Sequence, residues 1–313
     1  MSKLPVSISP HLHCGRSSRS IMLDVIIALI PAVIASTIIF GFRSLVLILV
    51  TVAACVLSEY LTRKILKRPD TIHNLTAVVT GILLALNLPV TLPFWMAALG
   101  GAIAIIVVKE FFGGVGQNFV NPAITARIVL LMSFASQMNT WQPPFDYRML
   151  DVDVVSSATY FSAVQTGNEI PSLVDMFLGV RAGSLGETCT LALLIGGIYL
   201  IVRKVISPII PVCFIGTVAI FSVLFGGDLL YQLMGGGLLL GAFFMATDYT
   251  TSPVTRNGKI IFGVGCGIIT VLIRFFAALP EGVSYAILLM NILVPHIENL
   301  TIPKVFGEEA KAK

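Results

Sequence analysis

The chain has 313 residues, of which 56% are hydrophobic and only 12% are charged, and its formal net charge is +4. An ordinary soluble domain carries about a quarter charged residues, and no soluble core could bury this much apolar sequence. The composition therefore excludes a soluble enzyme and predicts an all-α polytopic membrane protein. The basic residues are spread over loops and form no patch, so we expect no nucleic-acid partner.

The first apolar run starts near Ile21, after a tail with Arg16 and Arg19, and it reaches Arg43 without a small-residue cleavage site. This pattern favours a retained helix over a signal peptide. Charged positions and Pro/Gly positions then divide the chain into apolar spans of about 15 to 20 residues, near the length that a bilayer requires. We predict ten such spans, at 20–40, 44–62, 74–89, 93–109, 122–138, 186–202, 207–225, 229–248, 260–279 and 282–300.

The basic residues are distributed unequally between the two sides that these spans define. One side receives most of them, including Lys67, Lys109 and Lys259, whereas the other receives only Arg43, Arg148 and Arg181. By the positive-inside rule, both termini are predicted in the cytoplasm of a bacterial or archaeal cell. We therefore expect one integral domain, residues 1–313, in the cytoplasmic membrane, with the loop 139–185 outside.

Some spans contain many polar residues and glycines. The third contains Asn74 and Asn87 before Pro89, and the eighth begins near Gly235–Gly237 and ends at Asp248. Such helices are tolerated where they face protein or a cavity, and in transporters they mark a midplane site. Ten spans also allow two inverted five-helix halves. Small residues that serve only close helix packing are the alternative interpretation.

Two predicted cytoplasmic loops stand out by their chemistry. The loop 113–123 combines glycines, which allow a close approach to a ligand, with Asn118 and Asn121. The loop 245–253 contains Asp248. In each loop a dipeptide, Asn121-Pro122 or Ser252-Pro253, has the form of an N-cap followed by a first-turn proline. We predict both caps, and ligand binding by Asn118, Asn121 and Asp248 is an additional hypothesis.

The outer loop carries the string Asp153-Val154-Val155-Ser156-Ser157-Ala158-Thr159. Transfer of a flavin phosphate to a protein hydroxyl needs an exposed Thr or Ser on flexible backbone, small neighbours and an acid nearby. Thr159 has Ser156, Ser157 and Ala158 before it and Asp153 six residues upstream. By its composition alone, the string also fits an ordinary turn.

This string resembles the flavin-attachment motif of the NqrB/RnfD family, the membrane subunits of the Na⁺-Nqr and Rnf complexes, in which the final Thr carries FMN through a phosphoester. Ser157 stands where the family more often has Gly. Stretches near residues 9–11, 21–32, 118–123 and 243–248 are also similar to the family, so the resemblance covers nearly the whole chain. The length fits the Rnf branch better than the Nqr branch, whose members carry a longer N-terminal region.

The resemblance implies one component of a ferredoxin:NAD⁺ oxidoreductase complex that couples electron transfer to Na⁺ or H⁺ movement, in a fold similar to urea transporters. It implies FMN bound covalently to Thr159 at the outer face, and riboflavin nearer the cytoplasm as a second candidate cofactor. The implied partners are the other membrane and peripheral subunits, including a second covalent-FMN subunit and iron–sulfur subunits. We assign no catalytic residue and no metal site, and the chain is not expected to complete the reaction alone. It contains neither a Rossmann fingerprint nor a four-cysteine cluster.

Charged residues inside the spans are the remaining candidates. Arg274 lies in the outer half of the ninth span, where we expect it either to face inward toward the FMN phosphate or reduced flavin, or to snorkel to the interface. Arg127 is expected to pair with Asp248 or to flank a second flavin. Acidic residues are expected to be solvated at cytoplasmic helix ends: Asp24, Glu59, Glu110, Asp248 and Glu298. Asp24 and Asp248 are the better candidates for an ion path.

Three other functions remain open at this point. The first is the NqrB-type component of a Na⁺-translocating NADH:quinone reductase. The second is a urea-transporter-like solute channel, which predicts solute flux and no covalent flavin. The third is a membrane anchor that only supports redox partners, which predicts that Thr159→Val leaves electron transfer intact.

Overall fold

A computed structural model describes residues 17–146, 171–277 and 282–302, and every regular element within these ranges is helical. The first group of elements is α1 (Ser18–Phe40), α2 (Phe42–Ile65), the short 3₁₀ helix η1 (Ile72–Asn74), α3 (Thr76–Leu86), α4 (Phe94–Ala102), the π-helix η2 (Ile103–Glu110), α5 (Pro122–Ser133) and α6 (Ala135–Met138). The second group is α8 (Leu173–Leu178), α9 (Thr190–Val202), α10 (Ile209–Leu224), α11 (Leu229–Met234), α12 (Leu238–Leu240), the π-helix η3 (Gly241–Met245), α13 (Arg256–Phe276) and α14 (Val283–Thr301).

Helices occupy each of the ten segments in which the sequence predicts a span. Among the described residues, four helices are long and apolar enough to cross a membrane, namely α1, α2, α13 and α14. The third and eighth segments are short or interrupted, as their polar and glycine residues indicate. The prediction of an all-α membrane protein is therefore confirmed at this level.

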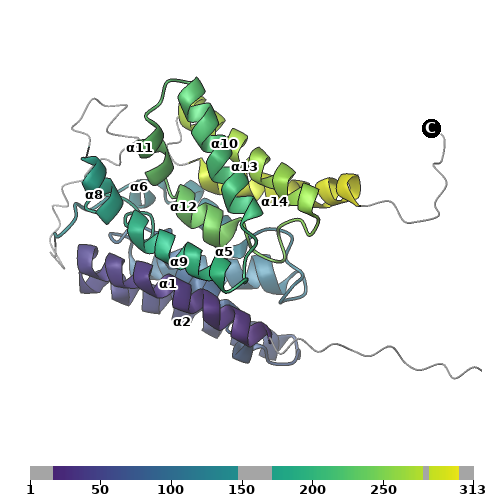
Figure 1. The fold of residues 1–313 in the computed structure, drawn as a ribbon. Helices are drawn as coiled ribbons and strands as arrows, with labels where there is room; N and C mark the ends of the chain where they lie inside the picture. Colours follow the sequence, from purple (N-terminus) through teal and green to yellow (C-terminus); the bar gives the residue numbers. More distant parts are fainter. Residues whose placement is uncertain (1–16, 147–170, 278–281, 303–313) are drawn as a thin grey trace, which may run out of the picture.

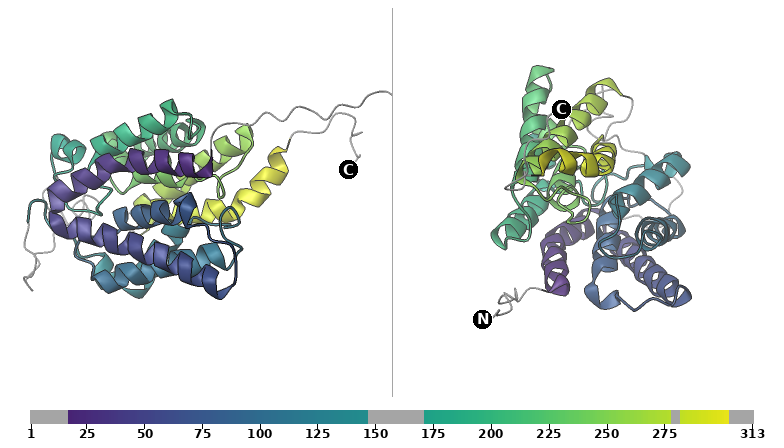
Figure 2. Two further views of the ribbon diagram at one scale, coloured as in Figure 1. Left: turned by 90° about the horizontal axis from the view of Figure 1, so that it is seen from below. Right: turned by 90° about the vertical axis from the view of Figure 1, so that its right-hand side faces the viewer.

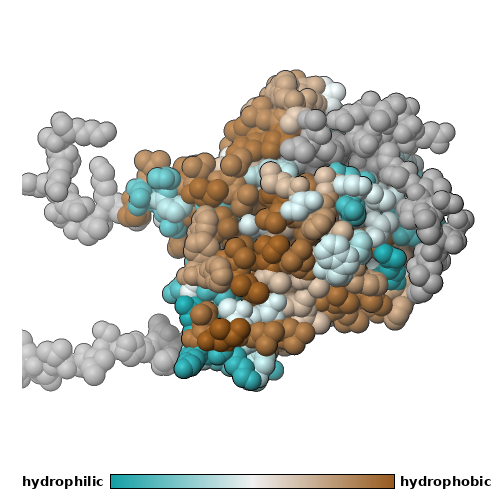
Figure 3. Space-filling model, turned by 180° about the vertical axis from the view of Figure 1, so that it is seen from behind, coloured by the Kyte–Doolittle hydropathy of each residue, from teal (hydrophilic) through white to brown (hydrophobic). Residues whose placement is uncertain are grey.

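The surface of the helices carries large apolar side chains that a soluble protein would bury. Ile38 on α1 is 60% exposed, and Val212 on α10 is 65% exposed. Figure 3 shows hydrophobic surface over much of one face of the molecule, with hydrophilic patches nearer its ends. Contiguous exposed apolar surface of this extent is typical of helices that face lipid.

The helices pack side by side in a bundle, and segments far apart in the sequence are neighbours in it. The helix α1 packs against α9, α2 against α3 and α4, and α10 against α13 (Figures 1 and 2). The start of α1 and the end of α14 lie at the same end of the bundle (Figure 1). We call this the terminal end and the other the opposite end.

The two predicted N-caps have different outcomes. The side chain of Asn121 accepts hydrogen bonds from the backbone N–H groups of Ala123 and Ile124, with Pro122 in the first turn, so this cap is confirmed. The other prediction is wrong, because α13 is capped by Thr255, whose hydroxyl accepts from Gly258 N. Thr255 offers the same hydroxyl cap one turn further along the chain, and Ser252 and Pro253 remain in the preceding loop.

Candidate functional site

A cavity of about 130 Å³ lies toward the terminal end, where both loops singled out in the sequence line it. Gly116, Asn118 and Asn121 contribute from the first loop, and Asp248 and Thr250 contribute from the second. Each loop follows a π-helical segment, η2 or η3. Such segments are rare and occur frequently at functional sites. The structure therefore brings Asn118, Asn121 and Asp248 together around one space.

The two loops are held together by amide side chains. Asn121 donates through Nδ2 to the carbonyl of Met245 at 3.2 Å while its Oδ1 caps α5. Asn291 of α14, with its amide oriented so that both ends are satisfied, donates to the Thr251 carbonyl at 3.0 Å and accepts from Asn121 N at 3.1 Å. Asn291 is not among the residues predicted from the sequence, because a single Asn in an apolar helix carries no local signal of its partner.

The polar side chains on the cavity wall have different hydrogen-bond partners. Asn118 donates to the Val120 carbonyl at 3.2 Å and is buried. The Asp248 carboxylate, in the loop after η3, accepts from the hydroxyls of Thr250 (2.9 Å) and Thr251 (3.1 Å). Asp248 is thus a hydrogen-bond acceptor on the cavity wall whose carboxylate is already bonded to two hydroxyls of its own loop.

The rest of the cavity wall is mostly apolar, with Phe243, Phe244 and Tyr249 among its side chains. Apolar walls with a few convergent polar groups are the general character of sites for small molecules and cofactors. Aromatic side chains and amides beside each other suit a flat heteroaromatic ligand with a polar edge. The chemistry of the lining therefore suits a flat ring with a polar edge, the class of ligand to which a flavin belongs.

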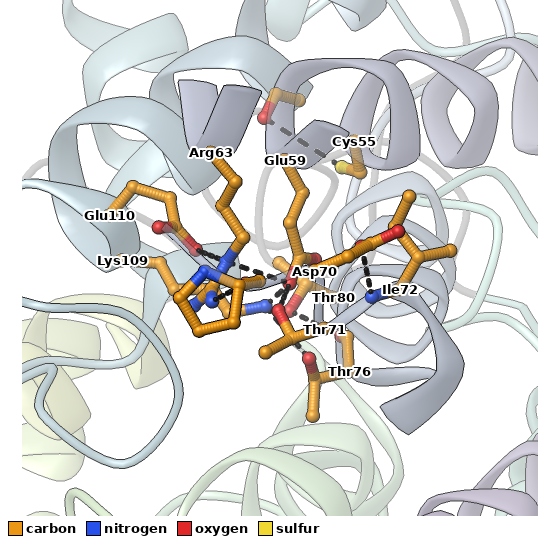
Figure 4. Close-up of polar contacts among 12 residues, drawn as sticks. Cys55, Glu59, Arg63, Asp70, Thr71, Ile72, Thr76, Thr80, Lys109 and Glu110 are labelled. Carbon is orange, nitrogen blue, oxygen red and sulfur yellow. Dashed lines mark hydrogen bonds and ion pairs between the residues drawn. The ribbon is translucent and has the colours of Figure 1, made fainter. Parts of the chain in front are cut away.

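A buried cluster of charges adjoins this cavity, in contrast to the prediction from the sequence. Glu59 and Glu110 are fully buried, so the expectation that they are solvated at the interface is wrong. Lys109 Nζ lies 3.0 Å from Glu59 Oε2, and Arg63 Nε lies 3.1 Å from Glu110 Oε1. Figure 4 shows these side chains converging with Thr71 and Thr76. Pairing with opposite charge offsets part of the cost of removing these groups from water.

Lys109 connects the cluster to the cavity. Its Nζ also donates to the Thr76 hydroxyl at 2.8 Å, and both Lys109 and Thr76 line the cavity. From the sequence, Lys109 is expected only as a cytoplasmic loop cation that contributes to the positive-inside rule. The sequence did contain one signal of a buried ion pair. Lys109 and Glu110 are adjacent charges of opposite sign at the end of an apolar run.

At the opposite end, Arg274 is buried inside the bundle. Its Nη1 donates to the Gln232 carbonyl at 2.7 Å, and its Nη2 donates to the Gly235 carbonyl at 2.8 Å. These carbonyls belong to the interrupted segment around α11, where the break in the helix leaves acceptors without intrahelical donors. Arg274 thus fixes the broken helix to α13, and its guanidinium is directed into the bundle.

Two more buried arginines lie in this part of the bundle. Arg181 donates through Nη2 to the carbonyls of Glu187 and Met234, each at 2.7 Å. Arg127 donates to the Ser284 hydroxyl at 2.6 Å. Ser284 lies at the start of α14, and the expected pairing of Arg127 with Asp248 stays a prediction. The loop 180–188 and the α11 segment therefore share a set of guanidinium–carbonyl bonds.

The flavin-attachment string, with Asp153, Ser156, Ser157, Ala158 and Thr159, lies outside the described residues. The described chain on either side of it is attached to the bundle. Phe145 N donates to the Ile39 carbonyl at 2.8 Å, and the Tyr231 hydroxyl donates to the Pro171 carbonyl at 3.0 Å. Tyr231 precedes Gln232, so Pro171 is attached beside the segment that Arg274 holds.

Asp24, a candidate for an ion path, is buried and paired. Its carboxylate accepts from Arg203 Nη2 at 3.2 Å and from the Tyr199 hydroxyl at 3.1 Å. Both partners lie at the end of α9, so Asp24 joins α1 to α9 at the terminal end.

Comparison with known proteins places the whole chain in one family. The model of the NQR2, RnfD, RnfE family matches residues 5–307. The D subunit of the Na⁺-translocating ferredoxin:NAD⁺ oxidoreductase complex of Acetobacterium woodii is 45% identical over 318 residues, which cover 99% of this chain and 98% of that protein. The D subunit of the proton-translocating complex of Clostridium ljungdahlii is 42% identical, with 96% of each chain covered. The D subunit of the ion-translocating oxidoreductase complex of Escherichia coli is 34% identical, with 96% and 98% covered.

Proposed function

Since the chain belongs to the NQR2, RnfD, RnfE family, we propose that it is the flavin-carrying D subunit of an ion-translocating ferredoxin:NAD⁺ oxidoreductase complex. The observation that carries this proposal is the identity of 45% with a protein of that name over nearly the full length of both chains. Agreement over the whole length favours this assignment over the Nqr counterpart. Its partners are the other membrane and peripheral subunits, including a second covalent-FMN subunit and iron–sulfur subunits.

The coupling ion does not follow from these relatives. The relative from Acetobacterium woodii is named for Na⁺ translocation and the one from Clostridium ljungdahlii for proton translocation, at 45% and 42% identity. The ion handled by this chain is therefore left as Na⁺ or H⁺.

We propose that Thr159 carries FMN through a phosphoester at the outer face. Support comes from the motif and from the attachment of its flanks, Phe145 and Pro171, to the bundle. Arg274 and Arg181 keep two buried positive charges at the opposite end, which favour an anionic phosphate or a negatively charged ring nearby. A flavin supplies electron transfer in single steps or in pairs, which connects one-electron iron–sulfur centres to two-electron carriers.

A second flavin, riboflavin, is proposed for the cavity between the two loops. Asn118, Asn121 and Asp248 lie on its wall, as does Lys109. The aromatic side chains would hold the ring, and the Lys109 ammonium would stabilise negative charge on its polar edge. The residues of this chain thereby bind and orient the ring, and the apolar lining excludes water.

For the topology, we propose ten membrane crossings with both termini in the cytoplasm, in a fold similar to urea transporters. Helices at each of the ten predicted positions support the count, although among the described residues only α1, α2, α13 and α14 are long and apolar enough to cross a membrane. Interrupted helices are acceptable at membrane depth where they line a cavity, as η2 and η3 do. The terminal end is then cytoplasmic, and the loop 139–185 is extracytoplasmic.

The attachment of FMN is tested by in-gel fluorescence of the denatured chain under ultraviolet light, purified from cells that contain the flavin transferase. We expect a fluorescent band for the wild type, no fluorescence for Thr159→Val, and retained fluorescence for Thr159→Ser, since serine keeps an esterifiable hydroxyl. A wild-type band without fluorescence would contradict the proposal and favour a solute channel or a membrane anchor.

A further inference from the structure

A continuous set of hydrogen bonds runs from the exposed loop after α2 to the wall of the cavity. The Thr71 hydroxyl donates to Glu59 Oε1 at 2.5 Å, and Lys109 Nζ donates to Glu59 Oε2 at 3.0 Å (Figure 4). Thr71 is half-buried in a loop whose neighbours Asp70 and Arg68 are exposed, whereas Glu59 is fully buried. The set therefore has one end near solvent and the other at the cavity.

Each member of this set can hold or pass a proton. A hydroxyl is both donor and acceptor, a carboxylate accepts on either oxygen, and a lysine ammonium has three N–H groups. Lys109 uses two of them, toward Glu59 and the Thr76 hydroxyl. Among the described residues the third has no partner, and Lys109 lines the cavity. The terminal donor is thus placed to serve a group in the cavity.

The surrounding charges keep the set balanced at rest. Arg63 and Lys109 face Glu59 and Glu110, so two positive charges oppose two negative ones inside the bundle. Loss of a proton from Lys109 would leave a net negative charge in a buried site, which is costly. That cost favours replacement of the proton, and Glu59 is the acid–base group next to Lys109.

We propose that Thr71, Glu59 and Lys109 form a proton path from the terminal end to the cavity, with Lys109 as the last donor. This inference rests on the proposed flavin in the cavity. Each electron that arrives in the cavity adds one negative charge there, and one proton that leaves Lys109 Nζ cancels it. Glu59 then accepts a proton that the Thr71 hydroxyl relays from solvent, and it passes this proton to the neutral Lys109 amine, so that the resting charges are restored. The electrons come from the iron–sulfur partners of the complex.

The test uses the purified complex in weakly buffered detergent solution. A photoexcited ruthenium complex supplies electrons, and a pH-indicator dye records the rate of proton uptake. Thr71→Val, which keeps the shape and removes the hydroxyl, is expected to slow uptake by about tenfold or more. Thr71→Ser is expected to keep the wild-type rate. The matched control is Thr62→Val at the same end of α2, since the Thr62 side chain makes no bond to this set in the described part of the chain.

A second readout separates a proton path from a merely structural bond. Formate, a small acid that can deliver protons without the threonine hydroxyl, is expected to restore rapid uptake in Thr71→Val. A lost structural bond would not respond to formate. Uptake in Thr71→Val at the wild-type rate, or slow uptake that formate does not change, would overturn the path.

The failure of the flavin proposal can be recognised independently. Acid extraction of the wild-type complex is expected to release one flavin that is not covalently attached. The Lys109→Met substitution is expected to change the amount of this flavin that the purified complex retains. If the wild type releases none, the flavin in the cavity is wrong and the path loses its acceptor. If the wild type and Thr71→Val release equal amounts of flavin and also take up protons at the same rate, the flavin proposal stands and only the proton path is wrong.

Discussion

At the scale of single residues, the charged side chains inside the bundle are held by partners that the sequence does not reveal. Lys109 and Glu59 bond to each other, whereas Arg274 and Arg181 bond mainly to backbone carbonyls at breaks between helices. An arginine presents several N–H groups in a fixed fork, so it can satisfy two or three such carbonyls together. Buried cations therefore have two roles in this protein: Lys109 neutralises a buried carboxylate, and Arg274 and Arg181 hold interrupted helices through their carbonyl groups.

Asn121 gives a prediction at this scale, because its side chain has two functions. Asn121→Ser keeps an oxygen that caps α5 and loses the donor to the Met245 carbonyl, whereas Asn121→Ala loses both. We expect Asn121→Ser to cost about 1 kcal/mol in the free energy of unfolding and Asn121→Ala about 2 kcal/mol. Unfolding in mixed detergent micelles measures both. Equal losses for the two variants would show that the cap contributes nothing.

At the scale of elements, close approach of helices depends on glycine at specific contacts. A Cβ on Gly196 of α9 would lie 2.2 Å from the Ala28 carbonyl oxygen of α1. No side chain fits that separation, so this glycine fixes how near α1 and α9 lie. In the third predicted span, a Cβ on Gly81 would lie 2.7 Å from the Val52 Cα of α2, so the close-packing interpretation is supported at that glycine.

The pair Gly196→Ala and Gly216→Ala tests this point with one chemical change. Gly196→Ala is expected to lower stability by about 1 to 3 kcal/mol, because the added methyl forces α1 and α9 apart. Gly216 of α10 has no atom within 4 Å of an added Cβ, so its substitution is expected to be neutral or stabilising. The thermal unfolding midpoint of each purified variant in detergent measures the difference. A loss for Gly216→Ala as large as that for Gly196→Ala would contradict the packing argument.

At the scale of the whole molecule, the distribution of basic residues and the packing of the helices agree on one arrangement. The start of α1 and the end of α14 lie at the same end (Figure 1). The Asp24–Arg203 pair brings the end of α9 to that end as well. The loops that line the cavity also lie there. The proposed orientation puts this end, with its second flavin, toward the cytoplasm.

Cysteine labelling tests the orientation. In a chain with Cys14, Cys189 and Cys213 replaced by serine, single cysteines are introduced as Lys67→Cys at the terminal end and Asp228→Cys between α10 and α11. Lys67 is exposed and Asp228 lies in a loop that is partly exposed. A membrane-impermeant maleimide added to intact cells is expected to label Asp228→Cys, and to label Lys67→Cys only after permeabilisation. The reverse pattern would contradict cytoplasmic termini.

The amino-acid sequence alone was enough to predict the class of the protein, the positions of its apolar segments, the Asn121 cap and the family. These properties depend on local composition and on short motifs, since lipid selects apolar runs of sufficient length whatever their neighbours. By contrast, the sharing of one cavity by two loops and the burial of Glu59 and Glu110 depend on how the helices pack in three dimensions. Lys109 and Glu59 lie 50 residues apart, and Asn121 and Met245 lie 124 apart. Contacts at such separations depend on how the helices pack, and neither hydropathy nor charge along the chain records it.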